Sequence, residues 1–429
     1  MKTVTLNIYS FLILLNGLLF SLPCAAYSVL THEAIIDASW EKSIQPLLKL
    51  KYPGTTEEQL QEAHAYAYGG AIIQDMGYYP FGSKLFSDLV HYVRSGDFVN
   101  ALLEESADVN EYAFALGALS HYVSDNYGHS IGTNLAVPIT YPKDKEKYGN
   151  LVTYAQDRTS HLRMEFSFDV LQTVRGNYAS LAYHNFIGFK VSTQVLERAF
   201  VKTYGIDIKD IFKDFSVAVD TFGWSVKNLI PEATKYAWII KESEINKTDL
   251  SSAAKKFKYK MIRANYYQED GKKHKKPQVL TWTFSRILQI FPKIGPLKGL
   301  RFKHPGKEAE KLFIQSFDTV MAYNTSYLKK LANGKIILKN TDLDTGNATE
   351  SGTYNLADDS YSKLLLKLKK KKFKNLNASV KNDILEYYSY PNLTIAKEKK
   401  SRIRKKMTAA LEDLKNAPIA VELYSVSKI

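Results

Sequence analysis

Apolar side chains recur every three or four residues along most of this chain, which is the pattern of amphipathic helices. Alternating patterns typical of strands are scarce, and no internal repeat is visible. We therefore expect an all-α fold, a multi-helix bundle. In the first half, the spacing predicts helices over residues 30–48, 57–73, 84–95, 111–124, 160–174 and 193–200. Thr31 is the expected N-cap of the first of them.

The composition changes at about residue 241, where polar, Lys-rich linkers begin to alternate with helical stretches. We expect three parts in the chain: a signal peptide at 1–26, a helical domain at 27–240, and a basic, mostly helical C-terminal region at 241–429. Within the last part, the pattern predicts helices over residues 278–291, 305–332, 358–372, 376–388 and 396–415.

The N-terminus has the features of an export signal. An apolar run over residues 8–22 precedes small residues at Cys24 and Ala26, which predicts cleavage before Tyr27. The run is short for a membrane span. Pro23 fits a lipoprotein signal poorly, so a lipid anchor on Cys24 is the less favoured interpretation. We expect a protein exported to the periplasm, the cell surface or the medium.

Composition excludes several classes of protein. Apolar residues make up 45% of the 429 positions and charged residues 24%, which rules out wholesale disorder. A single cysteine rules out a disulfide framework and any multi-cysteine metal site.

The net charge of +14 is unevenly divided. Residues 27–200 hold 13 Lys and Arg against 20 Asp and Glu, whereas residues 201–429 hold 44 against 24. The basic half is expected to approach anionic phospholipid or nucleic acid. A Lys-rich solvated surface without a partner is the alternative.

Histidines and carboxylates of the acidic half recur at ligand spacing. His121 and Asp125 lie four residues apart, on one face of a predicted helix, and His161 and Glu165 repeat this arrangement on a second helix. His129 follows just past Gly128, where the first of these helices is expected to end. The other candidates lie at helix ends or on neighbouring helices: His32, Asp75 and His91.

This series of side chains predicts a metal site. Imidazole nitrogens and carboxylate oxygens are suitable zinc ligands. One such pair alone is more often a surface contact. Five histidines and three carboxylates on the apolar faces of helices would be costly to bury without an ion. Ile36 stands where an HExxH motif beginning at His32 would need its second histidine, which disfavours a zincin protease.

In this order, the motifs resemble the zinc-dependent phospholipase C family and, more distantly, the fungal single-strand-specific zinc nucleases with the same helical fold. The likeness runs from Tyr27 to about Glu165 and continues faintly to about residue 240. The resemblance implies a buried cleft that holds up to three zinc ions. It implies these ligand sets: Asp75, His91, His121 and Asp125 for one ion; Asp125, His32 and the main-chain amine and carbonyl of Tyr27 for a second; His129, His161 and Glu165 for a third.

Two departures from the family pattern are visible. The first mature residue is Tyr27, where the family usually has Trp, and the five-residue interval from Tyr27 to His32 is closer to the nucleases. Asp125 and His129 are also closer together than in many members, which predicts a distorted or differently liganded third site.

The resemblance implies a phospholipase C-like enzyme that hydrolyses phospholipids by a zinc-bound hydroxide, with Asp75 as the candidate general base. The expected partner is a phospholipid or another phosphodiester, with peripheral membrane contact through the basic half. A zinc-dependent nuclease on the same scaffold is the second interpretation, favoured by the basic half. A zinc-binding surface protein without catalysis is the third.

The basic half has no motif of comparable strength. The aromatic and aliphatic stretch 282–291 is expected to pack against the bundle, with a position in a bilayer interface as the alternative. Asp342, Asp344 and Asn347 beside Gly346 lack the spacing of a calcium loop and are interpreted as a turn. The remaining histidines fit no ligand pattern and are expected to be structural or exposed: His64, His184, His274 and His304.

Overall fold

A computed structural model describes residues 28–231 apart from residue 180, residues 233, 234 and 237, residues 302–389 apart from residue 335, and residues 401–420. Within these ranges the chain forms helices and no strand, with one isolated antiparallel bridge between Thr341 and Ala348. The predicted all-α class is confirmed.

The described helices of the first half cover all six predicted ranges and include five that the pattern did not predict. They are α2 (Val29–Ser39), α3 (Gln45–Lys51), α4 (Glu57–Ile72), α5 (Lys84–Tyr92), α6 (Ser95–Glu105), α7 (Val109–Tyr127), α8 (Asn134–Thr140), α9 (Pro142–Tyr148), α10 (Arg158–Val174), α11 (Leu181–Ile187), α12 (Thr193–Tyr204) and α13 (Phe215–Trp224). Between them lie the π-helical segments Trp40–Ile44, Gly128–Thr133 and Ser225–Leu229, and the 3-10 segments Ile73–Tyr78 and Ile208–Asp210.

The predicted N-cap at Thr31 is wrong. Helix α2 begins at Val29, and Thr31 lies inside its first turn. The carboxylate of Asp169, on α10, accepts hydrogen bonds from the amides of Leu30 and Thr31 at 2.9 and 3.0 Å and from the Thr31 hydroxyl at 2.6 Å. A buried carboxylate from a distant helix therefore caps α2, as a side chain of the local sequence would in an isolated helix.

The centre of the bundle is the packing of α4 against α7. A Cβ atom on Gly70 would lie 1.9 Å from the carbonyl oxygen of Phe114, and one on Gly117 would lie 2.1 Å from that of Ala67. The two backbones therefore touch at positions where only glycine fits. This contact fixes α7 relative to the end of α4, and both regions carry predicted metal ligands.

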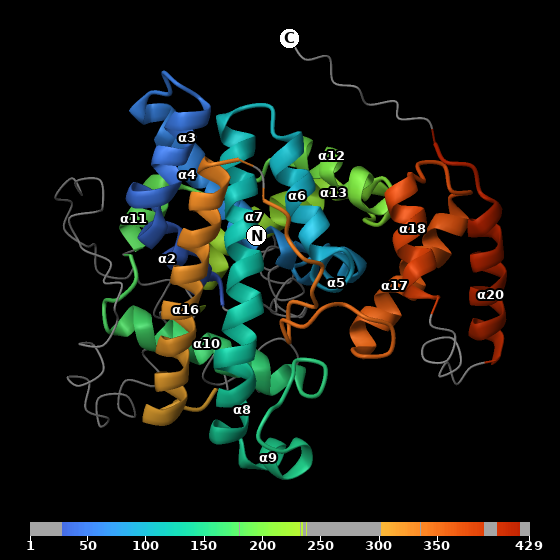
Figure 1. Cartoon of the computed structure of the whole chain (residues 1–429). Helices are drawn as coiled ribbons and strands as arrows, with labels where there is room; N and C mark the ends of the chain where they lie inside the picture. The colour runs from blue at the N-terminus through green and yellow to red at the C-terminus, as the bar shows by residue number, and fades with distance from the viewer. Residues whose placement is uncertain are drawn as a thin grey trace, which may run out of the picture.

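The C-terminal region contributes α16 (Gly306–Ala332), α17 (Asn355–Lys370), α18 (Ala378–Tyr387) and α20 (Ser401–Asn416). Four predicted helices of this region are thereby confirmed, and the fifth, at 278–291, lies outside the described residues. In Figure 1, α16 runs beside α7, while α17, α18 and α20 lie together at one side of the bundle.

Helix α16 belongs to the same hydrophobic core as the first half. The ring of Phe313 stacks on Phe168 at a centroid distance of 4.5 Å. A buried ion pair joins Glu310 to Arg175, at the end of α10. The predicted boundary near residue 240 lies outside the described residues, yet the core extends across it. No helix in the described ranges is both long and apolar enough to cross a membrane.

The close α4–α7 contact can be tested with Gly117→Ala. The added methyl group has no space against the Ala67 carbonyl. We therefore expect the free energy of unfolding to fall by about 1–3 kcal/mol, measured by urea unfolding. The matched control is Gly223→Ala in α13, where a Cβ meets nothing within 4 Å. This control should be neutral or slightly stabilising, and equal losses in the two variants would contradict the packing argument.

Candidate metal centre

The predicted side-chain ligands converge inside the bundle. They come from α2, the Ile73–Tyr78 segment, α5, α7, the Gly128–Thr133 segment and α10. Each is at most 5% exposed, although all of them can ionise: His32, Asp75, His91, His121, Asp125, His129, His161 and Glu165. Tyr27, the predicted main-chain ligand, lies outside the described residues.

Asp125 is the centre of two adjoining clusters. Its Oδ2 atom lies 3.1 Å from His121 Nε2 and 3.3 Å from His91 Nε2. Its Oδ1 atom faces His32 Nε2 at 3.7 Å, and Asp75 Oδ1 lies 3.5 Å from His91 Nε2. Two groups have donor atoms within 4.8 Å of one another: His32, His121 and Asp125, and Asp75, His91 and His121. Asp125 is therefore placed to bridge two ions.

The third cluster forms despite the shortened spacing between Asp125 and His129. Glu165 Oε1 lies 3.5 Å from both His129 Nε2 and His161 Nδ1. Helix α7 ends at Tyr127, as predicted, and His129 lies in the wider π-helical turn that follows. The three donor atoms lie within 4.8 Å of one another. The departure from the family spacing therefore does not keep this group of ligands apart.

Three of the imidazoles are oriented by backbone carbonyls. In each of them, the ring nitrogen that faces away from the cluster lies close to a carbonyl oxygen. These contacts are His91 to Ser87 at 2.8 Å, His121 to Ala71 at 2.9 Å and His161 to Val152 at 2.7 Å. Such contacts place the ring proton on the outer nitrogen and leave the inner one free for a metal.

The atoms that face the clusters fit zinc. Among the described residues, both carboxylate oxygens of Asp75 and Asp125, Glu165 Oε1, His161 Nδ1 and His129 Nε2 have no hydrogen-bond partner. Buried polar atoms without partners are costly. Imidazole nitrogen and carboxylate oxygen are also the donors that zinc binds. Bound ions would therefore satisfy these atoms.

Burial and neighbouring ligand side chains shift the pKa values of several groups in the clusters. Burial lowers the pKa of His32 well below its usual value, and the nearby His121 adds to this effect. Burial alone would also lower the pKa of His91, but Asp125 and Asp75 outweigh it and raise the pKa to about 10. Burial opposes ionisation of Asp125, yet His121 and His91 hold its pKa below the usual range. Without metal, the cluster therefore balances its carboxylates with bound protons.

Sequence reasoning missed one residue at this site. The turn predicted at 342–347 is present: Thr345 N donates to Asp342 Oδ1 at 2.7 Å and Gly346 N donates to Asp342 O at 2.9 Å. However, this turn carries Asp344 to a position 3.0 Å from His129 Nδ1. No local signal marks this contact, because the two residues are 215 positions apart.

The other histidines have different surroundings. His64 is buried against Asp37 at 3.1 Å, and His184 contacts Glu33 at 2.5 Å. His304 accepts a 3.0 Å hydrogen bond from the Gly306 amide at the start of α16. His274 lies outside the described residues.

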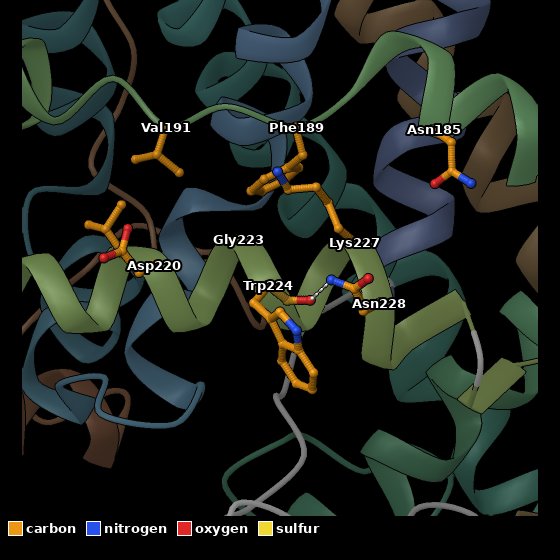
Figure 2. A pocket seen from close by; sticks show the side chains of 9 residues that line it. Asn185, Phe189, Val191, Asp220, Gly223, Trp224, Lys227 and Asn228 are labelled. Carbon is orange, nitrogen blue, oxygen red and sulfur yellow. Dashed lines mark hydrogen bonds between the residues drawn. The ribbon is translucent and has the colours of Figure 1, made fainter. Parts of the chain in front are cut away.

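A surface hollow of about 550 Å³ lies apart from these clusters. Figure 2 shows it between the Asn185–Val191 stretch and the helical stretch that carries Asp220, Trp224 and Asn228, which are among its lining residues. Asn228 donates a 2.9 Å hydrogen bond to the Trp224 carbonyl along the same helical stretch. The metal ligands come from other elements, so this hollow is a separate feature.

Zinc binding should release protons and weaken on acidification. Burial disfavours a charged His129, but Asp344 and Glu165 raise its pKa well above the usual value, and His91 is raised similarly. A metal must displace these protons, so its affinity falls as the pH falls. Calorimetry in two buffers of different ionisation enthalpy should detect the released protons. An affinity that stays constant between about pH 7.5 and about pH 5.5 would contradict this account.

The comparisons with known proteins agree with this geometry. Residues 31–214 match a sequence model of the family described as zinc dependent phospholipase C. No curated protein and no solved structure matches the chain. The matched segment contains all eight predicted side-chain ligands. Residues 31–214 are therefore similar to the zinc-dependent phospholipase C family.

Proposed function

We propose that this protein is a phospholipase C-like phosphodiesterase that hydrolyses phospholipids with the help of up to three zinc ions. The observation that supports the proposal most strongly is the convergence of three buried ligand groups within the family-matching segment. Bound zinc supplies a water of lowered pKa and positive charge that offsets the charge developing on the phosphate. We assign all eight side chains to zinc binding, and the main-chain atoms of Tyr27 to the ion beside His32.

The protein's own groups hold this arrangement. Asp125 presents its two oxygens to opposite sides, toward His32 and toward the pair formed by His91 and His121. Each oxygen would hold one ion, so Asp125 would bridge the two. The carbonyls behind His91 and His121 prevent the imidazoles from rotating out of the cluster.

Asp75 is the proposed general base. Its Oδ1 atom faces His91, which leaves Oδ2 to accept a proton from the attacking water. The proton then remains on the protein until it can be passed to the leaving alkoxide.

Two exposed aromatic side chains on joined elements favour lipid over nucleic acid. Phe81 is 62% exposed and follows the Ile73–Tyr78 segment that carries Asp75. A 2.8 Å hydrogen bond from Thr221 to the Pro80 carbonyl joins its loop to α13, where Trp224 is 51% exposed and points outward (Figure 2). Exposed aromatic side chains of this size are typical of contact with a membrane interface.

Two further parts of the proposal concern the chain ends. We propose that the protein is exported after cleavage before Tyr27, which would free the amine needed at the second zinc. We also propose that the Lys-rich C-terminal region makes peripheral contact with anionic membrane surfaces. The second candidate function, a zinc-dependent nuclease, is favoured by the interval from Tyr27 to His32.

The proposed activity can be tested on phosphatidylcholine, phosphatidylethanolamine and single-stranded DNA, each with and without a chelator. We expect chelator-sensitive release of phosphorylated headgroup. His121→Ala should reduce the rate at least about 1,000-fold, because His121 is an assigned ligand of the ion held with Asp75, His91 and Asp125. His304→Ala, a histidine outside the clusters, is the matched control and should keep the wild-type rate.

The outcomes separate the candidates. Activity on DNA alone would transfer the assignment to the nuclease. Zinc binding without hydrolysis of any of these substrates would favour a non-catalytic zinc-binding protein. An unchanged rate in His121→Ala would overturn the ligand assignment.

The proposed lipid contact can be tested with the double variant Phe81→Ser, Trp224→Ser. Its loss of exposed apolar surface should lower hydrolysis of phosphatidylcholine vesicles about tenfold, with little change on a monomeric short-chain phosphatidylcholine. Sedimentation with vesicles gives an independent measure of binding. Ile337→Ser, at a side chain that is 92% exposed in the C-terminal region, is the matched control. Equal losses on vesicles and on monomeric substrate would contradict the contact.

A further inference from the structure

His129 differs from the other oriented histidines of the centre. His91, His121 and His161 each present their outer nitrogen to a backbone carbonyl of a nearby element. The outer nitrogen of His129, Nδ1, instead lies 3.0 Å from the carboxylate oxygen Oδ1 of Asp344. This contact is an ion pair between the imidazole and the carboxylate.

The carboxylate of Asp344 is firmly held. It is 1% exposed, and its Oδ2 atom accepts hydrogen bonds from the amide of Tyr154 at 3.0 Å and from the hydroxyl of Tyr354. Its main-chain carbonyl accepts a 2.8 Å hydrogen bond from the Asn134 side chain. The Tyr154 amide also reaches Oδ1, at 3.3 Å, and Oδ1 lies closer to His129, at 3.0 Å.

The turn that carries Asp344 is docked on the elements of the metal centre. Leu343 N donates to the carbonyl of His91 at 3.1 Å, and the Thr341 hydroxyl donates to Asn126 Oδ1 at 2.8 Å. Gly346 has φ +75°, and a Cβ there would lie 2.8 Å from the Asn126 carbonyl oxygen. The segment is therefore anchored next to one ligand, His91, and next to the residue that follows Asp125.

We propose that Asp344 is a positioning residue for the third zinc site, acting through His129. A carboxylate behind a histidine ligand holds the proton on the outer nitrogen and directs the lone pair of the inner nitrogen at the metal. In His129 the inner nitrogen is Nε2, which faces Glu165. This inference rests on the zinc assignment that underlies the proposed function.

A consequence concerns the C-terminal region. The family match ends at residue 214, yet the third site takes its supporting carboxylate from residue 344. The matching segment therefore does not contain the whole metal centre. The C-terminal region contributes a part of it, besides any role at a membrane surface.

Asp344→Asn tests the proposal without a large change in shape. The Tyr154 amide can only donate, and it lies closer to Oδ2, at 3.0 Å, than to Oδ1, at 3.3 Å. With the Tyr354 hydroxyl also donating at Oδ2, the new amide oxygen takes that position and the NH₂ group faces His129 Nδ1. His129 must then accept at Nδ1 and carry its proton on Nε2, which faces the metal. Affinity for the third zinc should fall about 10- to 100-fold, measured by competition with a chromophoric chelator on the full mature chain.

Asp342→Asn is the matched control. Asp342 lies in the same turn and is also buried, but its carboxylate bonds Thr345 within the turn. This variant should bind three zinc ions with wild-type affinity. Thermal unfolding of both metal-free variants shows whether the turn is intact.

The results distinguish this inference from the proposed function. Selective loss of one zinc in Asp344→Asn, with the other two retained and unfolding like that of Asp342→Asn, supports the positioning role. Wild-type affinity at all three sites in Asp344→Asn overturns it, and so does equal zinc loss in the two variants. If the wild type binds three zinc ions but hydrolyses no phosphodiester, the proposed function fails while the zinc affinities still decide the role of Asp344.

Discussion

The structure depends on the burial of one carboxylate among imidazoles. Asp125 has contacts of 3.1 to 3.7 Å with His121, His91 and His32, and all four side chains are inaccessible to water or nearly so. Burying such groups without compensation raises the free energy of the folded state, and hydrophobic packing around them does not offset this desolvation penalty. Metal ions would turn this unfavourable arrangement into a stable one. The surrounding bundle is best understood as the framework that holds these groups in register.

That framework acts mainly through backbone contacts. Glycines let α4 and α7 approach until their main chains touch, so the ligand at the end of α4 and the two ligands on α7 share one rigid unit. At the other side, Asp169 caps α2 and fixes the turn that carries His32. The π-helical turn after α7 places His129 beside α10 and its two ligands. The glycine contacts, the Asp169 cap and the π-helical turn thus all position the metal ligands.

Helices and side-chain ligands could be predicted from the sequence because both have local signals. Apolar periodicity located the helices that it predicted to within a few residues but missed five others, among them α6 and α13. The i, i+4 pairs His121–Asp125 and His161–Glu165 marked two ligand faces. The grouping of the ligands into three sites came from the family resemblance. Contacts between distant parts of the chain had no local sequence signal. Asp169 caps α2, and the carboxylate of Asp344 contacts the outer nitrogen of His129. Both pairs are far apart in sequence, so the pattern around each residue describes only an ordinary helix or turn.

The uneven charge of the chain also has a clearer physical meaning. Three carboxylates of residues 27–200 lie in buried groups suited to cations, and part of the basic half packs into the same core. The most direct test of the central claim is diffraction from crystals of the mature protein at the zinc absorption edge. The account predicts three anomalous peaks, two beside Asp125 and one between His129, His161 and Glu165. Absence of peaks at these clusters, or zinc bound elsewhere in the chain, would contradict it.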